Sequence, residues 1–245
     1  MIYNLASPKK IIIPVKGDLI NLDLDGNGAK QYRVIKSNGE VAQVMSMYDY
    51  HGTVAWGGHS TTKMGTLTVA KYEGSDIDTY LNTTWYNKLT STTKAAIVPE
   101  SVVCDAWYQD NTGDPDYTGT YGNSVPGTNN YTISKYAGGT LNIGNRNVFV
   151  LGVQDVIDYL NDSSVQVDTT AILRNVNIWK MFWNGKVPEP DKNPWLRSSY
   201  ARDNEYVWFI NGKSGHLSCR DPTNPQIIRP TLNLDLNKIK FSIVS

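Results

Sequence analysis

Short extended segments separated by turn residues fill the first fifty positions of the chain. The segment DLINLDL (18–24) alternates imperfectly between apolar and polar positions, and DGNG (25–28) after it supplies turn residues. The segments 31–37 and 40–47 flank Asn38 and Gly39, and an Asn-Gly pair between two such runs is a strong hairpin signal. We therefore expect an antiparallel meander in this part of the chain.

The hydrophobic period changes to that of a helix near residue 75. Ser75 and Asp78 form a capping pattern. The apolar positions that follow share one helical face, and they are Ile77, Tyr80, Leu81, Trp85 and Leu89. A second short helical turn within 90–98 should end before Pro99, because the residue ahead of a proline is pushed out of the helical region.

A long segment without a sustained period follows, from 107 to 139, and it is rich in Gly, Asn, Asp, Thr and Tyr. We interpret it as a loop that serves function, acts as an interaction arm or is disordered. Its tyrosines favour packing against another surface.

The second half of the chain predicts a strand and two helices, then short strands again. Within 145–162 a strand should precede a helix that carries Val153, Val156, Ile157 and Leu160. A third helix within 169–185 should place Ile172, Val176, Trp179 and Trp183 on one face and stop at Gly185. Neither a repeat nor a linker divides the chain, so we expect one domain over 17–245, preceded by an arm over 1–16.

Composition and charge then exclude several classes of protein. Lys plus Arg equals Asp plus Glu at 23 each, with no long block of one sign, so the basic footprint of a nucleic-acid binder is missing. The apolar run near the N-terminus ends at Pro14, which is too short for a signal peptide or a membrane span, so neither is predicted, nor is a lipid anchor. Cys104 and Cys219 match no metal or redox spacing; we expect two free thiols, with a disulfide as the alternative.

Two segments near the C-terminus resemble a bacterial and phage domain family of unknown function. They are WLRSS (195–199) and IIRPTLNLDL (227–236), which parallel the family's W-L-R-S and R-P-A-L motifs, although Thr231 replaces the alanine. The resemblance spans about residues 17 to 240 and includes YRVI (32–35), YLNTTWYNKL (80–89) and NVFVLGVQDVIDYL (147–160).

This resemblance implies an α+β, C-type-lectin-like fold, with small twisted antiparallel sheets, two or three flanking helices and long loops. The fold group includes the formylglycine-generating enzyme type and the variable receptor-binding proteins of phages and retroelements. It implies a structural role in the core for Trp195, Arg197, Arg229 and Pro230, with Arg197 paired to a buried acid or to carbonyl groups.

Catalytic chemistry finds no support in the sequence, so we expect a protein that is not an enzyme. The oxidising enzymes of this fold group need two cysteines close together near the C-terminus, and only Cys219 lies there. The histidines at 51, 59 and 216 are scattered, and no G-x-S-x-G or H-E-x-x-H motif occurs.

Calcium is a weak alternative, since no cofactor is otherwise expected. Glu189 and Asp191, with Asp203 and Asn204, are similar to the paired oxygen ligands of true lectins. The segment DLDGNG (23–28) fits only the first half of a calcium loop, and we interpret it as a turn.

A surface that binds a partner is the function that remains. The predicted ligand-binding residues surround one strand-turn-strand, and they are Tyr200, Arg202, Asp203, Asn204, Tyr206, Trp208, Asn211, Lys213 and His216. The resemblance implies a phage virion protein of a tail, baseplate or capsid appendage that binds a host surface glycan or protein. A structural or decoration protein that contacts other virion proteins, and a retroelement-type variable protein of a bacterium, remain open. We also expect a homo-oligomer, with no nucleic-acid partner and no membrane insertion. The arm should dock to the particle or to a sister subunit through strand addition.

Overall fold

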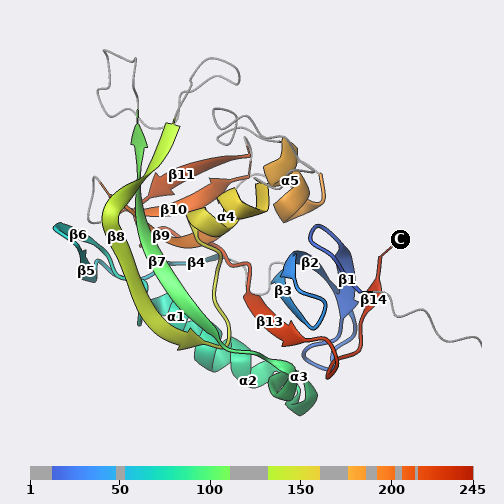
Figure 1. The fold of residues 1–245 in the computed structure, drawn as a ribbon. Coiled ribbons are helices and arrows are strands. Elements are labelled where there is room, and N and C mark those ends of the chain that lie inside the picture. The colour runs from blue at the N-terminus through green and yellow to red at the C-terminus, as the bar shows by residue number, and fades with distance from the viewer. Residues whose placement is uncertain are drawn as a thin grey trace, which may run out of the picture.

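Two five-stranded sheets form the centre of the molecule, and a few short helices pack beside them (Figure 1). This computed structural model describes residues 13–47, 53–110, 132–160, 176–185, 192–201, 206–212 and 215–244. Within these ranges the fold is mixed α/β and consists mostly of strands. None of the helices in this part of the chain is long and apolar enough to cross a membrane.

The first sheet is antiparallel throughout and has the order β13-β3-β2-β1-β14. Its strands are β1 Leu19–Leu22, β2 Lys30–Ser37, β3 Val41–Ser46, β13 Thr231–Asp235 and β14 Ser242–Ile243. The predicted hairpin is confirmed: β2 pairs with β3, and Gly39 in the turn has a φ of 91°, which a side chain would disfavour. The same sheet joins the two ends of the described chain.

The second sheet has the order β11-β10-β9-β7-β8, and only the β7–β9 pair is parallel. Its strands are β7 Glu100–Asp110, β8 Thr132–Arg146, β9 Trp195–Tyr200, β10 Val207–Asn211 and β11 His216–Arg220. The interpretation of 107–139 as a loop is therefore wrong at both of its ends. Register shifts near Val103 and Trp107 break the alternation that reveals a strand, and β8 lies at the edge of the sheet.

Two small ladders complete the strands. β4 Thr53–Val54 pairs with β12 Gln226–Ile227, and β5 Thr61–Met64 pairs with β6 Leu67–Ala70. The strand expected just before residue 153 is reduced to an isolated bridge between Phe149 and Thr231.

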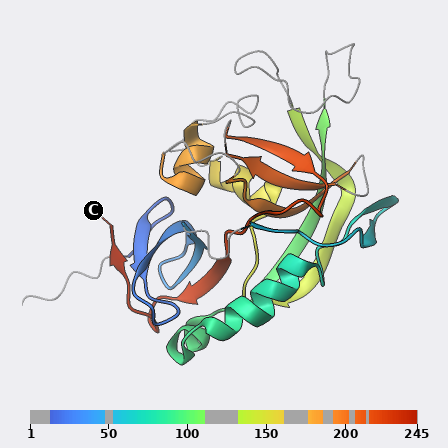
Figure 2. The ribbon, with the colours of Figure 1, turned by 180° about the vertical axis from the view of Figure 1, so that it is seen from behind.

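The first helical segment runs along one side of both sheets (Figures 1 and 2). It consists of α1 Asp76–Tyr80, a π-helical turn η1 Leu81–Trp85, α2 Tyr86–Lys88 and, after a break, α3 Ser91–Ala96. The Ser75 cap is confirmed, because its side chain accepts a hydrogen bond from the N–H of Asp78 at 3.2 Å. The second turn ends before Pro99, as predicted.

Two further helices, α4 Val153–Leu160 and α5 Val176–Trp183, cover the second sheet. The predicted face of α5 is wrong, because its buried residues are Ile178, Met181 and Phe182, whereas Trp179 and Trp183 are half-buried. The indole N–H of Trp179 donates to the carbonyl of Gly212 at 3.0 Å, and this polar end holds the ring at the rim. Ile172 lies outside the described residues.

The second sheet has a hydrophobic core on each face. Val207 and Phe209 of β10 pack into the larger core, which also includes Trp56 and the buried side of the first sheet. Trp208 and Ile210 pack into a smaller core with α4 and α5. The central strands are therefore covered on both sides, and only their ends and edges can meet a partner.

Candidate functional site

The predicted ligand-binding residues divide between the core and segments outside the described residues. Tyr200 and Trp208 are buried, with ring centroids 5.6 Å apart in a T-shaped contact, and the indole N–H of Trp208 donates to the carbonyl of Trp107 at 3.3 Å. This corrects the expectation that they are displayed, because helices α4 and α5 cover their face of the sheet. Tyr206 and Asn211 are half-buried at the ends of β10, and His216 begins β11.

The remaining predicted contact residues are not described. Outside the described residues lie Arg202, Asp203, Asn204 and Lys213, together with the calcium candidates Glu189 and Asp191. Among the described residues no group of His, Cys, Asp or Glu side chains could hold a metal ion.

The segment DLDGNG forms a turn in which backbone N–H groups donate hydrogen bonds to the aspartate side chains of the same segment. Asp23 accepts a hydrogen bond from the N–H of Gly26 at 2.8 Å, and Asp25 accepts one from the N–H of Asn27 at 3.1 Å. Asp25 also pairs with Lys30 at 2.6 Å. These contacts are those of a local Asx turn, which is the interpretation that the sequence favoured.

The predicted structural residues lie in the interior. The indole N–H of Trp195 donates to the carbonyl of Val54 at 3.0 Å. Arg229 and Pro230 are buried beside the first sheet, and the Arg229 guanidinium lies 6.0 Å from the centre of the Trp183 ring.

Arg197 is the buried cation of the second sheet. Its Nε donates to the carbonyl of Val103 at 2.9 Å, and its Nη1 donates to the carbonyl of Val150 at 2.8 Å and to the Asp155 carboxylate. The acid and carbonyl partners that the resemblance implies are therefore present around this guanidinium.

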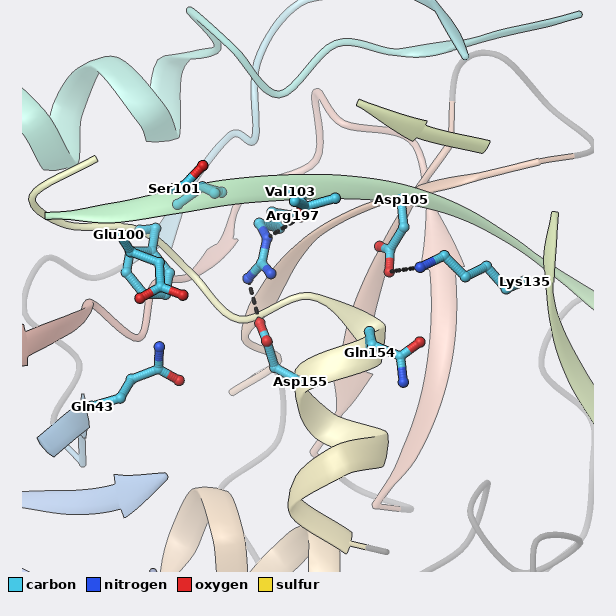
Figure 3. A pocket seen from close by; sticks show the side chains of 11 residues that line it. Gln43, Glu100, Ser101, Val103, Asp105, Lys135, Gln154, Asp155 and Arg197 are labelled. Carbon is cyan, nitrogen blue, oxygen red and sulfur yellow. Dashed lines mark hydrogen bonds and ion pairs between the residues drawn. The ribbon is translucent and has the colours of Figure 1, made fainter. Parts of the chain in front are cut away.

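Arg197 also lines a cavity of about 210 Å³ where the two sheets meet (Figure 3). The first sheet contributes Gln43, β7 and β8 contribute most of the wall, and the start of α4 closes the other side. The lining residues are Gln43, Glu100, Ser101, Val102, Val103, Asp105, Lys135, Phe149, Gln154, Asp155 and Arg197.

The first turn of α4 is fixed by side chains beside this cavity. The N–H of Gly152 donates to Asp155 Oδ2 at 2.8 Å, and the N–H of Val153 donates to Ser198 Oγ at 2.8 Å. Ser198 Oγ in turn donates to the buried Asp105 carboxylate. The helix start is thereby linked to both β7 and β9.

The ionisation of these groups follows from their burial and their neighbours. Burial opposes the charge of the Asp155 carboxylate, but Arg197 outweighs it and holds the pKa of Asp155 below its usual range. Burial likewise opposes the Arg197 cation, and Asp155 outweighs it, so the pKa of Arg197 lies above its ordinary value. Burial also raises the pKa of the nearby Cys104 thiol to about 12. Cys104 and Cys219 are both buried, and neither forms a disulfide.

Arg197 is the only residue lining the cavity that the sequence singled out for a role. The sequence did carry a signal for Asp155, because this residue stands three positions after Gly152 at the start of a predicted helix. An acidic side chain at that position of a helix suits a capping contact. Glu100, Lys135 and Gln43 carried none, since they come together only in the folded chain.

Comparison with known proteins places the chain in a family. No curated protein and no solved structure matches it. The family described as "Domain of unknown function (DUF6273)" matches residues 60–236, which extend from β5 to β13 and include all residues lining the cavity except Gln43. Since the match covers more than half of the sequence, the chain belongs to the DUF6273 family.

Proposed function

We propose that this chain is a non-enzymatic binding protein of C-type-lectin-like fold, carried on a phage particle in a tail, baseplate or capsid appendage. In this proposal it attaches to a glycan or protein of the host surface through the connections at one end of the second sheet. The observation that supports this proposal is that the connections following β7 and β9 leave the sheet side by side, at the same end.

The strands leading into residues 111–131 and 202–205 end side by side. Trp107 of β7 is in register with Tyr200 of β9, and the N–H of Ala201 donates to the carbonyl of Trp107 at 2.8 Å. The N–H of Tyr200 donates to the carbonyl of Tyr206 at 2.9 Å, which closes the 201–206 connection at the same end. Connections held by a rigid, two-sided core are the usual place for binding residues.

The lectin-like part of the proposal is supported by the layout of the described elements. Strand β1 pairs with β14, which brings the two ends of the described chain into one sheet. Short helices pack against the two sheets in both views (Figures 1 and 2).

Binding of purified protein to a glycan array and to intact bacteria tests this proposal. The triple variant Arg202→Ala, Asp203→Ala, Asn204→Ala should lose binding while its thermal unfolding midpoint stays unchanged. Lys240→Ala, an exposed change on the first-sheet side of the molecule, is the control and should bind normally. Repeating the assay in EDTA tests the calcium alternative, and unchanged binding excludes it. Full binding by the triple variant would contradict the proposed surface.

A structural role in the same particle is the second candidate. Ile13 and Val15, which lie within the predicted N-terminal arm, are 51% and 59% exposed. Exposed apolar side chains of this kind suit contact with another subunit. Light scattering, which measures the oligomeric state of the wild type and of the Ile13→Ser, Val15→Ser variant, separates the structural role from host attachment. A monomeric protein with full cell binding would argue against the structural role.

A further inference from the structure

We propose that the cavity at the junction of the two sheets binds a small, uncharged ligand rich in hydroxyl or amide groups, such as a single neutral sugar ring. This site is separate from the connections that carry the proposed attachment function. It is built from described residues of β3, β7, β8, α4 and β9 (Figure 3).

The charges around the cavity already balance one another. Arg197 is paired with Asp155, and the Glu100 carboxylate lies 3.2 Å from Lys36 Nζ. Lys135 Nζ lies 3.8 Å from the Asp105 carboxylate, which is buried. A ligand with a net charge would enter without a counter-charge left to pair with it, and it would lose its hydration. A neutral ligand avoids that cost.

Unused hydrogen-bonding atoms remain on the paired groups. Arg197 is only 7% exposed, and its Nη2 makes no hydrogen bond with the described residues although Nε and Nη1 make three. Both contacts to Asp155 use Oδ2, so Oδ1 can still accept. Gln154 and Gln43 donate through Nε2 to Asp158 and Asn233, which leaves their Oε1 atoms as acceptors. A donor and several acceptors facing one small space match a ligand with several hydroxyl groups.

The helix start offers no competing anion site. In many helices the first N–H groups bind phosphate or carboxylate. Here the N–H groups of Gly152 and Val153 donate to Asp155 and Ser198, so those positions are occupied by the protein itself. The carboxylate of Asp155 would also repel an anion placed there.

The size and the apolar part of the wall favour a small ring. A volume of about 210 Å³ is smaller than the roughly 300–1,000 Å³ of pockets that bind drug-sized ligands. Val102, Val103 and Phe149 supply apolar atoms, and Val103 is 40% exposed. One side of a bound ring could pack its C–H groups against Val103 while its hydroxyl groups reach Arg197 and Asp155.

Isothermal titration calorimetry with matched sugars tests the proposal on the full chain. The neutral probes are glucose, N-acetylglucosamine and myo-inositol, and the charged probes are glucuronate and glucosamine. We expect saturable binding of at least one neutral probe, and binding about tenfold or more weaker for its charged counterpart. No binding of any neutral probe, or equal binding of a charged one, would overturn the proposal.

Matched valine variants locate the site. Val103→Trp fills the cavity and should abolish binding, whereas Val98→Trp places the same ring on a valine that is 36% exposed and lies outside the lining, and should bind normally. Gln154→Met keeps the size of a half-buried side chain, removes the amide and should weaken binding several-fold, which covers the case in which Val103→Trp fails to fold. The Arg202, Asp203, Asn204 triple variant should keep sugar binding. If the triple variant lost sugar binding, or if Val103→Trp bound the sugar normally, the ligand site would lie outside this cavity.

Discussion

Arg197 on β9 and Asp155 in the first turn of α4 form an ion pair that fastens the helix to the second sheet. The same Arg197 side chain holds the carbonyls of Val103 on β7 and Val150 ahead of α4. One guanidinium therefore joins three segments that are distant in the sequence, at the wall of the cavity between the two sheets. Its removal affects all of them at once.

Arg197→Met should destabilise the fold by roughly 3–5 kcal/mol, because it leaves the Asp155 carboxylate without its cation and two carbonyls without a donor. Urea unfolding measures the change. The double variant Arg197→Met, Asp155→Leu should lose less than the sum of the two single variants, since no unpaired charge remains. Lys240→Met is the control and should stay within about 0.5 kcal/mol of wild type. A loss below about 1 kcal/mol for Arg197→Met would contradict the role of this pair.

Acid should weaken the fold partly through Asp155. The pKa of this carboxylate is lower in the folded chain than the value of about 3.9 in the unfolded chain, so its stabilisation is present above about pH 4 and is lost as the pH falls through the folded pKa. Asp155→Asn should be less stable at neutral pH and should lose less stability on acidification than wild type. Urea unfolding at a series of pH values measures both slopes, and parallel slopes would show that Asp155 does not contribute.

Gly152→Ala should disturb the same contact between the start of α4 and Arg197 of β9. A Cβ at this position would lie 3.1 Å from Arg197 Cζ and 3.2 Å from Ser198 Oγ, which are both buried. We expect a loss of about 1–3 kcal/mol, as for other overpacked positions. Gly58→Ala is the matched control, because a Cβ there would meet nothing within 4 Å. Equal stability of the two variants in thermal unfolding would argue against the close approach.

The sequence predicted elements whose signals are local. Asn38 and Gly39 marked the hairpin of the first sheet, and Ser75 marked the start of α1, because a turn or a cap is decided by neighbours a few positions away. The extent of β7 and β8 was not predictable in this way. Their pairing is made by backbone groups, and shifts of register near Val103 and Trp107 erase the side-chain alternation.

The cavity was hidden for a different reason. Gln43, Glu100, Lys135, Asp155 and Arg197 come from five separate elements, and none of them is unusual in its own segment. Burial of Trp208, in contrast, carried a signal that our prediction did not use. A strand covered on both faces reads as a continuous apolar run, and residues 207–210 form such a run.

The two thiols should be unreactive in the folded protein. Burial raises the pKa of Cys104 to about 12, so almost no thiolate forms at neutral pH. In the Cys219→Ser variant, which leaves Cys104 alone, reaction with a disulfide reagent should be slow until guanidinium unfolds the chain, and should then release one equivalent per chain. Rapid reaction of the folded variant would contradict the burial of Cys104.

Alanine variants of Tyr206 and Trp208 should separate surface from core. Trp208 is fully buried against Tyr200, so Trp208→Ala should cost roughly 3–5 kcal/mol and lower the thermal unfolding midpoint strongly. Tyr206 is half-buried beside the 202–205 connection, so Tyr206→Ala should cost less and should reduce attachment to the host surface while the chain stays folded. Thermal unfolding and cell binding, measured on both variants, distinguish the two effects. A folded Trp208→Ala protein that loses only attachment would mean that the indole meets the partner directly, which its burial between β10 and the two helices argues against.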